Sequence, residues 1–344
     1  MKLFEPFTIH NLHLKNRIVM PPMCMYQATA DGFPTLFHIC HYAARALGGA
    51  GLIIVESTGV TPGGRITDRD LGLWNNDQID GMRRITDIIH TNGAKAALQL
   101  NHAGRKSQSV AALPLGPGDA AFDDRYRAPR AMTREQISQT VRAFGEAAGR
   151  AAAAGFDALE IHGAHGYLIH EFLSPLTNTR TDEYGGSLEN RVRFLREVLT
   201  AAHANWPADR PLWLRVSASD YSEGGIDGGM MVEIIRRVSP LIDLVHVSSG
   251  GLLPVKVTDY PGYQVALSAK IRRECGLPTI AVGLITNEAM AEGILSEGRA
   301  DLVAMGRQLL RDPYWPVNTA ARHSIPGYVP ESYRRAFPGA HPHA

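Results

Sequence analysis

The chain has 344 residues, of which 44% are hydrophobic and 20% are charged. Its 35 Lys and Arg against 34 Asp and Glu give a formal net charge of +1. These values exclude a disordered, collagen-like or coiled-coil protein. The balanced charge gives no electrostatic reason to expect nucleic acid or an anionic membrane as a partner. Barrels of the α/β class reach this length as one domain, so we expect a single domain over 1–344.

Cysteine content and the chain start indicate a cytoplasmic protein. Cys24, Cys40 and Cys275 form no C-x-x-C motif and are too few for a disulfide framework, which fits free thiols in a reducing compartment. The first residues lack the apolar run of a signal peptide. No stretch approaches the ~18 apolar residues of a membrane span.

Eight short apolar runs recur along the chain and predict buried strands. They are rich in Ile, Val and Leu with little alternation, which is typical of parallel strands covered on both faces. In chain order they span residues 17–23, 51–56, 95–100, 157–162, 212–217, 243–248, 279–282 and 301–305.

Helical patterns separate these runs. They cover residues 35–47, 77–92, 133–154, 188–205, 229–238, 265–275 and 287–297, and a short helix is expected near Gly306. Several of them stop at glycine, and Thr133 with Gln136 has the spacing of a capping box. Eight strand–helix alternations predict a single (β/α)8 TIM barrel. A doubly wound sheet is the alternative, although the chain contains no G-x-G-x-x-G.

The length exceeds the about 250 residues of a bare barrel, so insertions are expected. The surplus falls in a lead-in at 1–16, in segments 101–132, 163–186 and 249–263, and in a tail at 313–344. The three internal segments follow strands, so they are predicted to lie on the C-terminal face that carries barrel active sites. The tail can reach a partner subunit.

Strand ends carry the features of an anion site. Gly283 and Gly306 follow the seventh and eighth strands, and Gly306 opens a short helix, which is how barrels bind phosphate. Arg307 can add a bidentate contact; two tight turns without a ligand are the alternative. Arg215 lies inside the fifth strand, where an unpaired charge is costly. It should meet an anion or carboxylate, and a structural ion pair is the alternative.

His162 and His165 lie three residues apart where the fourth strand ends. Two imidazoles can share a metal, but zinc needs three or four ligands. The other strand ends offer Gln99, Arg215 and Ser248 instead. We therefore favour two hydrogen-bond donors aimed at one carbonyl oxygen, with two non-functional loop histidines as the alternative. Cys24, after the first strand, is either a small buried hydrophobe or a nucleophile, but no hydrolase signature accompanies it.

These strand ends resemble the Old Yellow Enzyme family of FMN-dependent ene-reductases, in particular its thermophilic-like (YqjM-like) subgroup. The resemblance covers nearly the whole chain. Its most specific run is residues 162–175, His-Gly-Ala-His-Gly-Tyr-Leu-Ile-His-Glu-Phe-Leu-Ser-Pro, and it continues to Arg191. The run Pro-Met-Cys-Met-Tyr at 22–26 indicates the subgroup.

The resemblance implies tightly bound FMN, with NADPH or NADH as the hydride donor. The residues that it assigns to FMN are Pro22, Met23, Cys24, Ser57, Gln99, Arg215, Gly283, Gly306 and Arg307. In these roles Cys24 tunes the redox potential and Arg215 favours the anionic reduced flavin. The chain departs from the subgroup at Pro21, often Ser, which removes a backbone donor, and at Ser57, where a close relative has Ala.

The resemblance also implies a reaction, the reduction of the C=C bond of enones and enals. His162 and His165 would grip the substrate carbonyl, Tyr167 would give a proton to Cα, and Tyr26 would help to bind substrate. Arg335 would reach a neighbouring subunit's active site, which implies a homodimer or homotetramer. No metal is expected.

Three other functions stay open at this stage. One is a different flavin oxidoreductase of the same family, although three cysteines are too few for the iron–sulfur cluster that such enzymes usually carry. The second is a metal-dependent barrel hydrolase that uses the two histidines. The third is a flavin-binding protein without turnover.

Overall fold

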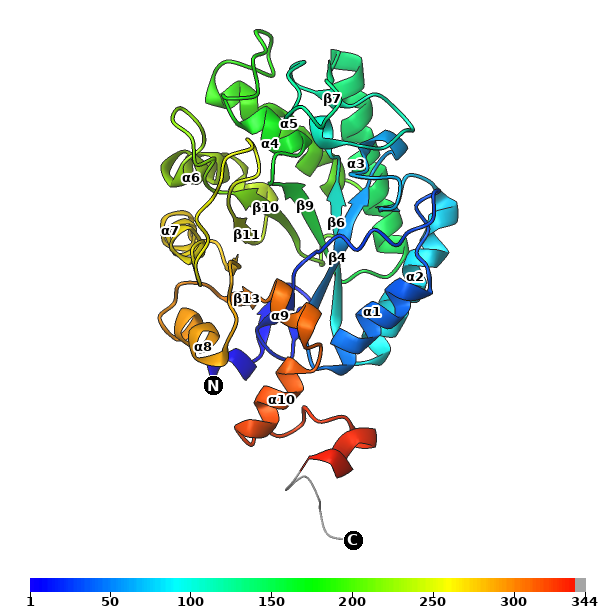
Figure 1. Ribbon diagram of the computed structural model, residues 1–344, viewed down its shortest axis with the longest axis vertical. Helices are drawn as coiled ribbons and strands as arrows, with labels where there is room; N and C mark the ends of the chain where they lie inside the picture. Colours follow the sequence, from blue (N-terminus) through cyan, green and yellow to red (C-terminus); the bar gives the residue numbers. More distant parts are fainter. Residues whose placement is uncertain (338–344) are drawn as a thin grey trace.

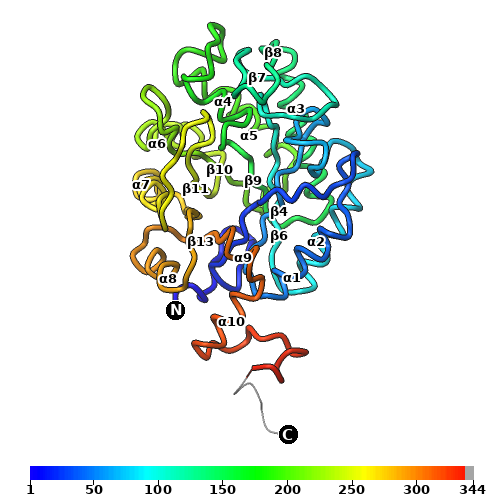
Figure 2. Tube along the Cα trace, viewed as in Figure 1, coloured from blue at the N-terminus to red at the C-terminus, as the bar shows by residue number. Residues whose placement is uncertain are grey.

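Eight parallel strands form a closed barrel. The barrel lies at the centre of the molecule, as the ribbon and the Cα tube both show (Figures 1 and 2). The computed structural model describes residues 1–337. Around the barrel the strands run β3, β4, β6, β9, β10, β11, β12 and β13, and β13 pairs with β3 to close it. The predicted (β/α)8 barrel is therefore confirmed.

Each barrel strand overlaps one of the eight predicted runs. The strands are β3 (Ile18–Met20), β4 (Leu52–Gly59), β6 (Lys95–Asn101), β9 (Ala158–Gly163), β10 (Leu212–Ser217), β11 (Val245–Ser248), β12 (Thr279–Ala281) and β13 (Leu302–Ala304). The outer helices are α1 (Leu36–Leu47), α2 (Ile79–Thr91), α3 (Arg134–Ala153), α5 (Leu188–His203), α6 (Gly228–Val238), α7 (Val265–Cys275), α8 (Glu288–Ser296) and α9 (Gly306–Arg311).

The start of α3 shows how the sequence determines a helix boundary. Thr133 Oγ1 accepts the Gln136 N–H at 3.2 Å, and Gln136 Oε1 accepts the Thr133 N–H at 3.0 Å, so the expected capping box forms. Ile137, Phe144 and Ala148 are fully buried on one face of the helix. Their helical spacing gives α3 the apolar stripe that packs on the barrel.

Two layers of apolar side chains hold the barrel together, because alternate strand residues face opposite sides. One cluster, with Ile53 and Leu98 among its members, packs between the strands and the helices. A second cluster fills the barrel interior and includes Ile54, Ala97 and Trp213. Alternate residues of each strand therefore point into the barrel, and we call them its inward series. The site residues belong to these inward-facing positions.

The lead-in 1–16 has a structural role that sequence patterns did not reveal. β1 (Phe7–Ile9) and β2 (Leu12–Leu14) form an antiparallel hairpin. Leu12 and Leu14 are 2% exposed and belong to the interior cluster. The hairpin thus closes the N-terminal end of the barrel with apolar side chains and leaves the other end for polar ones.

The predicted insertions also contain short elements. α4 (Leu168–Leu173) lies in the segment after β9, and β7 (Leu115–Gly116) pairs with β8 (Arg130–Ala131) in the segment after β6. The tail carries α10 (Trp315–Arg322) and extends away from the barrel in Figure 1. Within residues 1–337, the helices are too short or too polar to span a bilayer.

Candidate active site

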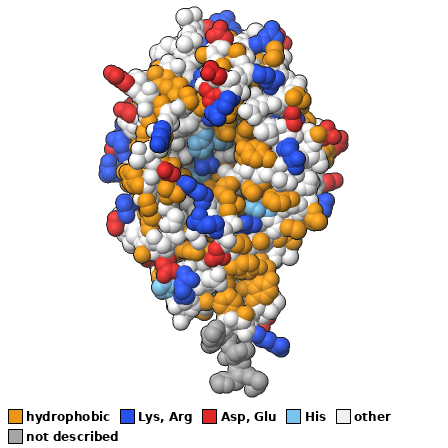
Figure 3. Space-filling view, viewed as in Figure 1, with side chains coloured by type: hydrophobic (Ala, Val, Ile, Leu, Met, Phe, Trp, Pro, Cys, Tyr) orange, Lys and Arg blue, Asp and Glu red, His pale blue; other side chains and the backbone are white. Residues whose placement is uncertain are grey.

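Polar residues replace apolar ones toward the C-terminal end of the barrel. On β9 the inward series runs Ala158, Glu160 and His162, and on β10 Trp213 is followed by Arg215. The strand register pairs His162 with Arg215. Figure 3 shows histidine and basic side chains in a hollow near the middle of the face in view. The register therefore brings the predicted cation beside the predicted histidine pair.

The two histidines lie side by side, as expected from their spacing. His165 Nδ1 is 3.4 Å from His162 Nε2, and the rings meet edge to face with centroids 5.1 Å apart. His162 Nδ1 accepts the Ala164 N–H at 3.2 Å, so the His162 proton is on Nε2. His165 Nε2 lies 2.8 Å from Ser248 Oγ. Both rings thus have defined hydrogen-bonding partners.

Both histidines are held neutral. Desolvation lowers the pKa of His162 and of His165 well below the ordinary value, and the charge of Arg215 lowers it further. A neutral imidazole has one N–H to donate. The pair therefore suits a neutral oxygen that gains negative charge during a reaction.

Tyr167 packs directly on this pair. Its ring meets the His162 ring edge to face, with centroids 4.9 Å apart. Burial raises the pKa of Tyr167 well above the ordinary value, and the negative charges of Cys24 and Tyr26 would raise it further. The phenol therefore keeps its proton at neutral pH and is available as an acid.

Lys106 adds a cation that the sequence did not single out. Its Nζ donates to the carbonyl oxygens of His165 at 3.0 Å and Gly251 at 2.9 Å. The same nitrogen lies 5.6 Å from the Tyr167 ring centroid. Desolvation lowers the pKa of Lys106 to about 8. Lys106 thus ties the loop after β9 to the loop after β11, a link that spans distant segments and leaves no local sequence signal.

The backbone beside the histidines is strained. His165 has φ +57° and Gly166 has φ +72°. A Cβ on Gly166 would lie 2.2 Å from the Gly251 carbonyl oxygen, so only glycine fits there. Strain of this kind is retained where the surrounding structure requires it, commonly at functional sites.

A cavity of about 240 Å³ lies next to Arg215. Gly283, Gly306 and Arg307 line it with Arg215, so the predicted anion-site residues come together. The same cavity has lining residues that sequence reasoning missed: Gln264, Thr286 and Arg311.

The two glycines that line this cavity allow neighbouring side chains to pack close to the backbone. A Cβ on Gly306 would lie 3.2 Å from the Met23 Sδ, and one on Gly283 would lie 2.9 Å from the Gln264 Nε2. Gly283 also has φ +122°, which favours glycine. Arg307 is exposed, and its guanidinium is 3.7 Å from the Asp259 carboxylate.

Arg215 is buried, and its guanidinium is not fully hydrogen-bonded. Its side chain is 7% exposed, and its Nε has no hydrogen-bond partner among residues 1–337. Desolvation lowers its pKa, and the carboxylate of Glu160 acts in the opposite direction. The Glu160 oxygens are already bonded to Gln99, Trp213 and His246. Arg215 is therefore still available for a ligand anion or carbonyl.

The segment after β3 forms another wall of the site. Met25 N donates to Glu56 Oε2 at 2.8 Å, which fixes the turn that carries Cys24 and Tyr26. Burial raises the pKa of the Cys24 thiol well above its ordinary value, and the carboxylates of Asp70 and Glu56 act the same way. Cys24 therefore stays a thiol at neutral pH. Tyr26 is 42% exposed with φ +55°.

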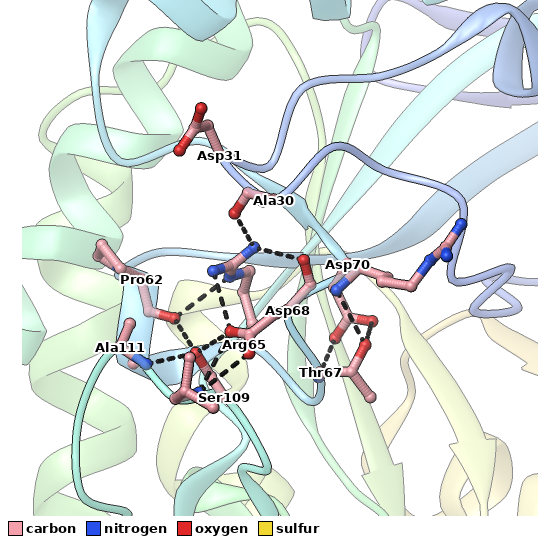
Figure 4. A network of polar contacts seen from close by, with 12 residues as sticks. Ala30, Asp31, Pro62, Arg65, Thr67, Asp68, Asp70, Ser109 and Ala111 are labelled. Atoms are coloured by element: carbon pink, nitrogen blue, oxygen red, sulfur yellow. Dashed lines mark hydrogen bonds and ion pairs between the residues drawn. The ribbon is translucent and has the colours of Figure 1, made fainter.

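A polar network holds the loops on this side (Figure 4). Arg65 donates to the Ala30 oxygen at 2.8 Å and to the Asp68 carboxylate at 3.2 Å. Ser109 Oγ donates to the same carboxylate at 2.6 Å. Arg69 Nε donates to the Tyr26 oxygen at 2.8 Å. Loops after three different strands are thereby joined, and the Tyr26 backbone is held in place.

Ser57 and Gln99 are nearly inaccessible at the strand ends. Ser57 is 4% exposed and accepts the Asn101 amide at 2.9 Å; the β4–β6 register shifts between Val55 and Thr58, next to it. Gln99 is 1% exposed, and its Nε2 donates to Glu160 Oε1 at 2.7 Å. Irregular register near a site is a common way to redirect a side chain.

Arg335 lies apart from this cluster. It belongs to the 3-10 helix Glu331–Ala336 in the tail and is exposed. It is not among the residues that line the Arg215 cavity. As for metals, residues 1–337 contain no group of three His, Cys, Asp or Glu side chains suited to hold an ion.

Several known proteins are similar to this chain over most of its length. The NADH:flavin oxidoreductase / NADH oxidase family matches residues 2–324. An NADPH dehydrogenase of Clostridium acetobutylicum is 53% identical over 338 residues, 98% of this chain and 100% of that protein. One of Bacillus subtilis is 48% identical over 98% and 99% of the two chains. Among solved structures, morphinone reductase is similar with a TM-score of 0.80 at 29% identity, over 92% of this chain and 88% of that one.

Proposed function

The chain belongs to the NADH:flavin oxidoreductase / NADH oxidase family, the Old Yellow Enzyme family expected from its sequence, and we propose that it is an ene-reductase. Family membership confirms an oxidoreductase that uses FMN and a reduced nicotinamide. The proposed reaction is reduction of the C=C bond of an α,β-unsaturated carbonyl compound. The neutral pair His162 and His165, with the protonated Tyr167 beside it, is the observation that carries the proposal.

The residues around the cavity fit FMN. The orphaned Nε of the buried Arg215 offers a donor to a polar ring edge, and Gly283 and Gly306 line the cavity without side chains of their own. We assign the phosphate to Gly283, Gly306 and Arg307. The isoalloxazine is assigned to the residues Pro22, Met23, Cys24, Ser57, Gln99 and Arg215. FMN, when bound, supplies the transfer of a hydride from NAD(P)H to the substrate carbon.

The histidines bind the substrate oxygen in this proposal. The 3.4 Å contact between His165 Nδ1 and His162 Nε2 is long for a hydrogen bond, so a carbonyl oxygen can replace it. His162 then donates from Nε2 and His165 from Nδ1. His165 Nε2 must then accept the Ser248 hydroxyl, 2.8 Å away, which has to turn from Gln264 Oε1, its acceptor at 3.0 Å in the structure. Each well-placed donor to a developing enolate oxygen contributes about 3 kcal/mol.

Tyr167 supplies the proton that completes the reduction. Its raised pKa keeps the phenol protonated until negative charge develops at the substrate Cα. Tyr26, whose side chain is exposed, is assigned to substrate binding. Cys24 remains a thiol, and its proposed role is to tune the flavin potential.

We further propose a homodimer or homotetramer in which Arg335 completes a neighbouring site. Arg335 is exposed on the tail, which extends from the barrel at the bottom of Figure 1. Large apolar side chains are also exposed on α1 and on the tail, with Leu36 at 69%, Phe37 at 39% and Tyr333 at 39%. Exposed apolar surface of this kind marks an interaction site.

The decisive experiment is a spectroscopic titration of the purified protein. Visible flavin absorption should be bleached by NADPH without oxygen and should return when 2-cyclohexenone is added. A His162→Ala/His165→Ala variant should still be bleached but should recover far more slowly. A colourless protein would refute the cofactor assignment. Bleaching without recovery in the wild type would instead leave a flavoprotein that is not an ene-reductase.

A further inference from the structure

Glu160 is a fully buried carboxylate below the proposed flavin site. It lies on β9 between Ala158 and His162, with 0% exposure. Three other strands, β6, β10 and β11, supply its partners. Oε1 accepts Gln99 Nε2 at 2.7 Å, and Oε2 accepts Trp213 Nε1 at 2.7 Å and His246 Nδ1 at 2.8 Å. A buried charge is tolerated when it is hydrogen-bonded in this way.

The contact with Gln99 determines which way its amide faces. Glu160 Oε1 is an acceptor without a proton to donate, so it must meet the N–H end of the amide. The reversed amide would place two acceptors 2.7 Å apart. The Gln99 carbonyl oxygen is therefore directed away from Glu160 and is available to accept a hydrogen bond from a ligand.

Glu160 also balances the charge of Arg215. The two residues are on adjacent strands, Arg215 two positions beyond Trp213, the register partner of Glu160. The oxygens of Glu160 are shared among three other donors, while Arg215 Nε has no partner among the described residues. The carboxylate thus offsets the cation electrostatically without occupying its donors.

We propose that Glu160 is a positioning residue for the flavin, which fixes the Gln99 amide orientation and sets the charge balance at Arg215. This inference rests on the proposed function, because it takes the flavin ring to lie against Gln99 and Arg215. In this proposal Glu160 acts from below the site, through Gln99 and Arg215, and does not contact the substrate.

The test is Glu160→Gln, assayed by FMN binding to the apoprotein and by the midpoint potential of bound FMN. The new amide at position 160 presents an N–H to Gln99, so the Gln99 amide must invert and turn its N–H toward the ligand. We expect FMN to bind about tenfold more weakly, as for one lost hydrogen bond. The midpoint potential should shift in the positive direction, because the charge of Arg215 is no longer offset.

Two further variants separate positioning from simple loss of stability. The exchange Gln99→Glu/Glu160→Gln restores both an acceptor facing the ligand and the buried negative charge, so FMN affinity and potential should return toward the wild-type values. Trp213→Phe removes one donor to Glu160 but leaves the Gln99 contact. It should lower the melting temperature with little change in potential.

The possible results are distinct. Wild-type affinity and potential in Glu160→Gln would overturn the proposal, as would no recovery in the exchange variant relative to Glu160→Gln. If Glu160→Gln does not fold, the exchange variant decides: FMN binding near the wild-type value supports the proposal and its absence refutes it. Failure of the wild-type protein to reoxidise with enone would contradict the ene-reductase function alone, since these measurements concern FMN and not turnover.

Discussion

Single residues in this site owe their chemistry to burial. Desolvation by the surrounding protein keeps the imidazoles of His162 and His165 neutral, and it keeps the phenol of Tyr167 protonated. The same effect acts on Glu171, which is 1% exposed on α4 behind Tyr167.

Tyr167→Phe tests the proton donor. Loss of the hydroxyl should slow flavin reoxidation by 2-cyclohexenone about 10²- to 10⁴-fold, the usual contribution of a general acid. Flavin reduction by NADPH should be nearly unchanged, because that step needs no proton from the phenol. Stopped-flow absorbance follows both steps. Tyr184→Phe is the matched control, since the Tyr184 hydroxyl donates to Glu197 outside the site. Equal slowing of both steps would contradict the assignment.

Glu171→Gln tests a pH dependence of stability. Desolvation raises the pKa of Glu171 from 4.5 to about 8, although the Arg105 N–H bond and charge oppose it. Between these values the folded protein holds a proton that the unfolded chain has lost. Wild-type stability should therefore fall as pH rises from about 5 to 8 through this group.

The amide that replaces the Glu171 carboxyl cannot ionise, so the variant should lack this component of the pH dependence. The melting temperature of Glu171→Gln relative to the wild type should thus rise steadily from about pH 5 to about pH 8. Differential scanning fluorimetry of both proteins measures it. Glu223→Gln, at an exposed position, is the control and should show a constant difference. A constant difference for Glu171→Gln would mean that Glu171 is ionised throughout.

The short connection between β9 and α4 places the histidines and Tyr167. The strand β9 ends at Gly163, and α4 begins at Leu168, so only four residues make the connection. Within it His165 and Gly166 both have positive φ. Lys106 donates a hydrogen bond to the His165 oxygen, and Gly251 packs closely against Gly166. Strand, turn and helix together present His162, His165 and Tyr167 to one point.

Gly166→Ala tests this turn. The added methyl would meet the Gly251 oxygen at 2.2 Å in a left-handed backbone, so we expect a loss of about 2–4 kcal/mol of stability together with slower reoxidation by enone. Gly276→Ala is matched to it, with φ +70° and no atom within 4 Å of the added Cβ. That variant should lose only about 1 kcal/mol. Urea unfolding compares them, and equal losses would show that the close approach to Gly251 has no cost.

The barrel has an apolar end and a polar end. The hairpin of β1 and β2 closes one end with Leu12 and Leu14, and the loops after the strands open at the other. The net charge of +1 agrees with recognition that depends on a few local charges. The tail extends beyond the barrel and provides the residue proposed for a neighbouring site.

Arg335→Ala tests that arrangement. If the guanidinium completes a neighbour's site, the variant should raise the KM for enone about tenfold, as for loss of one charged contact. Co-expression with a His162→Ala/His165→Ala chain should restore a low KM in the mixed oligomer, because each partner supplies what the other lacks. Arg334→Ala, the adjacent exposed arginine, should leave the KM unchanged. A mixed oligomer without recovery would mean that Arg335 does not complete a neighbour's active site.

Local patterns were enough to predict the barrel and part of the site. Strand runs and helical patterns alternate eight times because each depends on nearby residues, and the Thr133 cap formed as expected. His162, His165 and Tyr167 are close in the chain, so one turn brings them together. Gln264 and Lys106 escaped notice, since they reach the site from distant loops.

By itself the sequence determined the (β/α)8 architecture, the family and the identity of the clustered histidines, because these follow from short-range periodicity and contiguous motifs. Only the tertiary structure decided that residues 7–14 close the barrel and that Arg215 keeps a free Nε among the described residues. It alone placed Glu160 against Gln99, Trp213 and His246, which are 61, 53 and 86 residues away. Parallel strands are joined by crossover connections of about a dozen or more residues, so these partners lie far apart in the chain and no local pattern contains both.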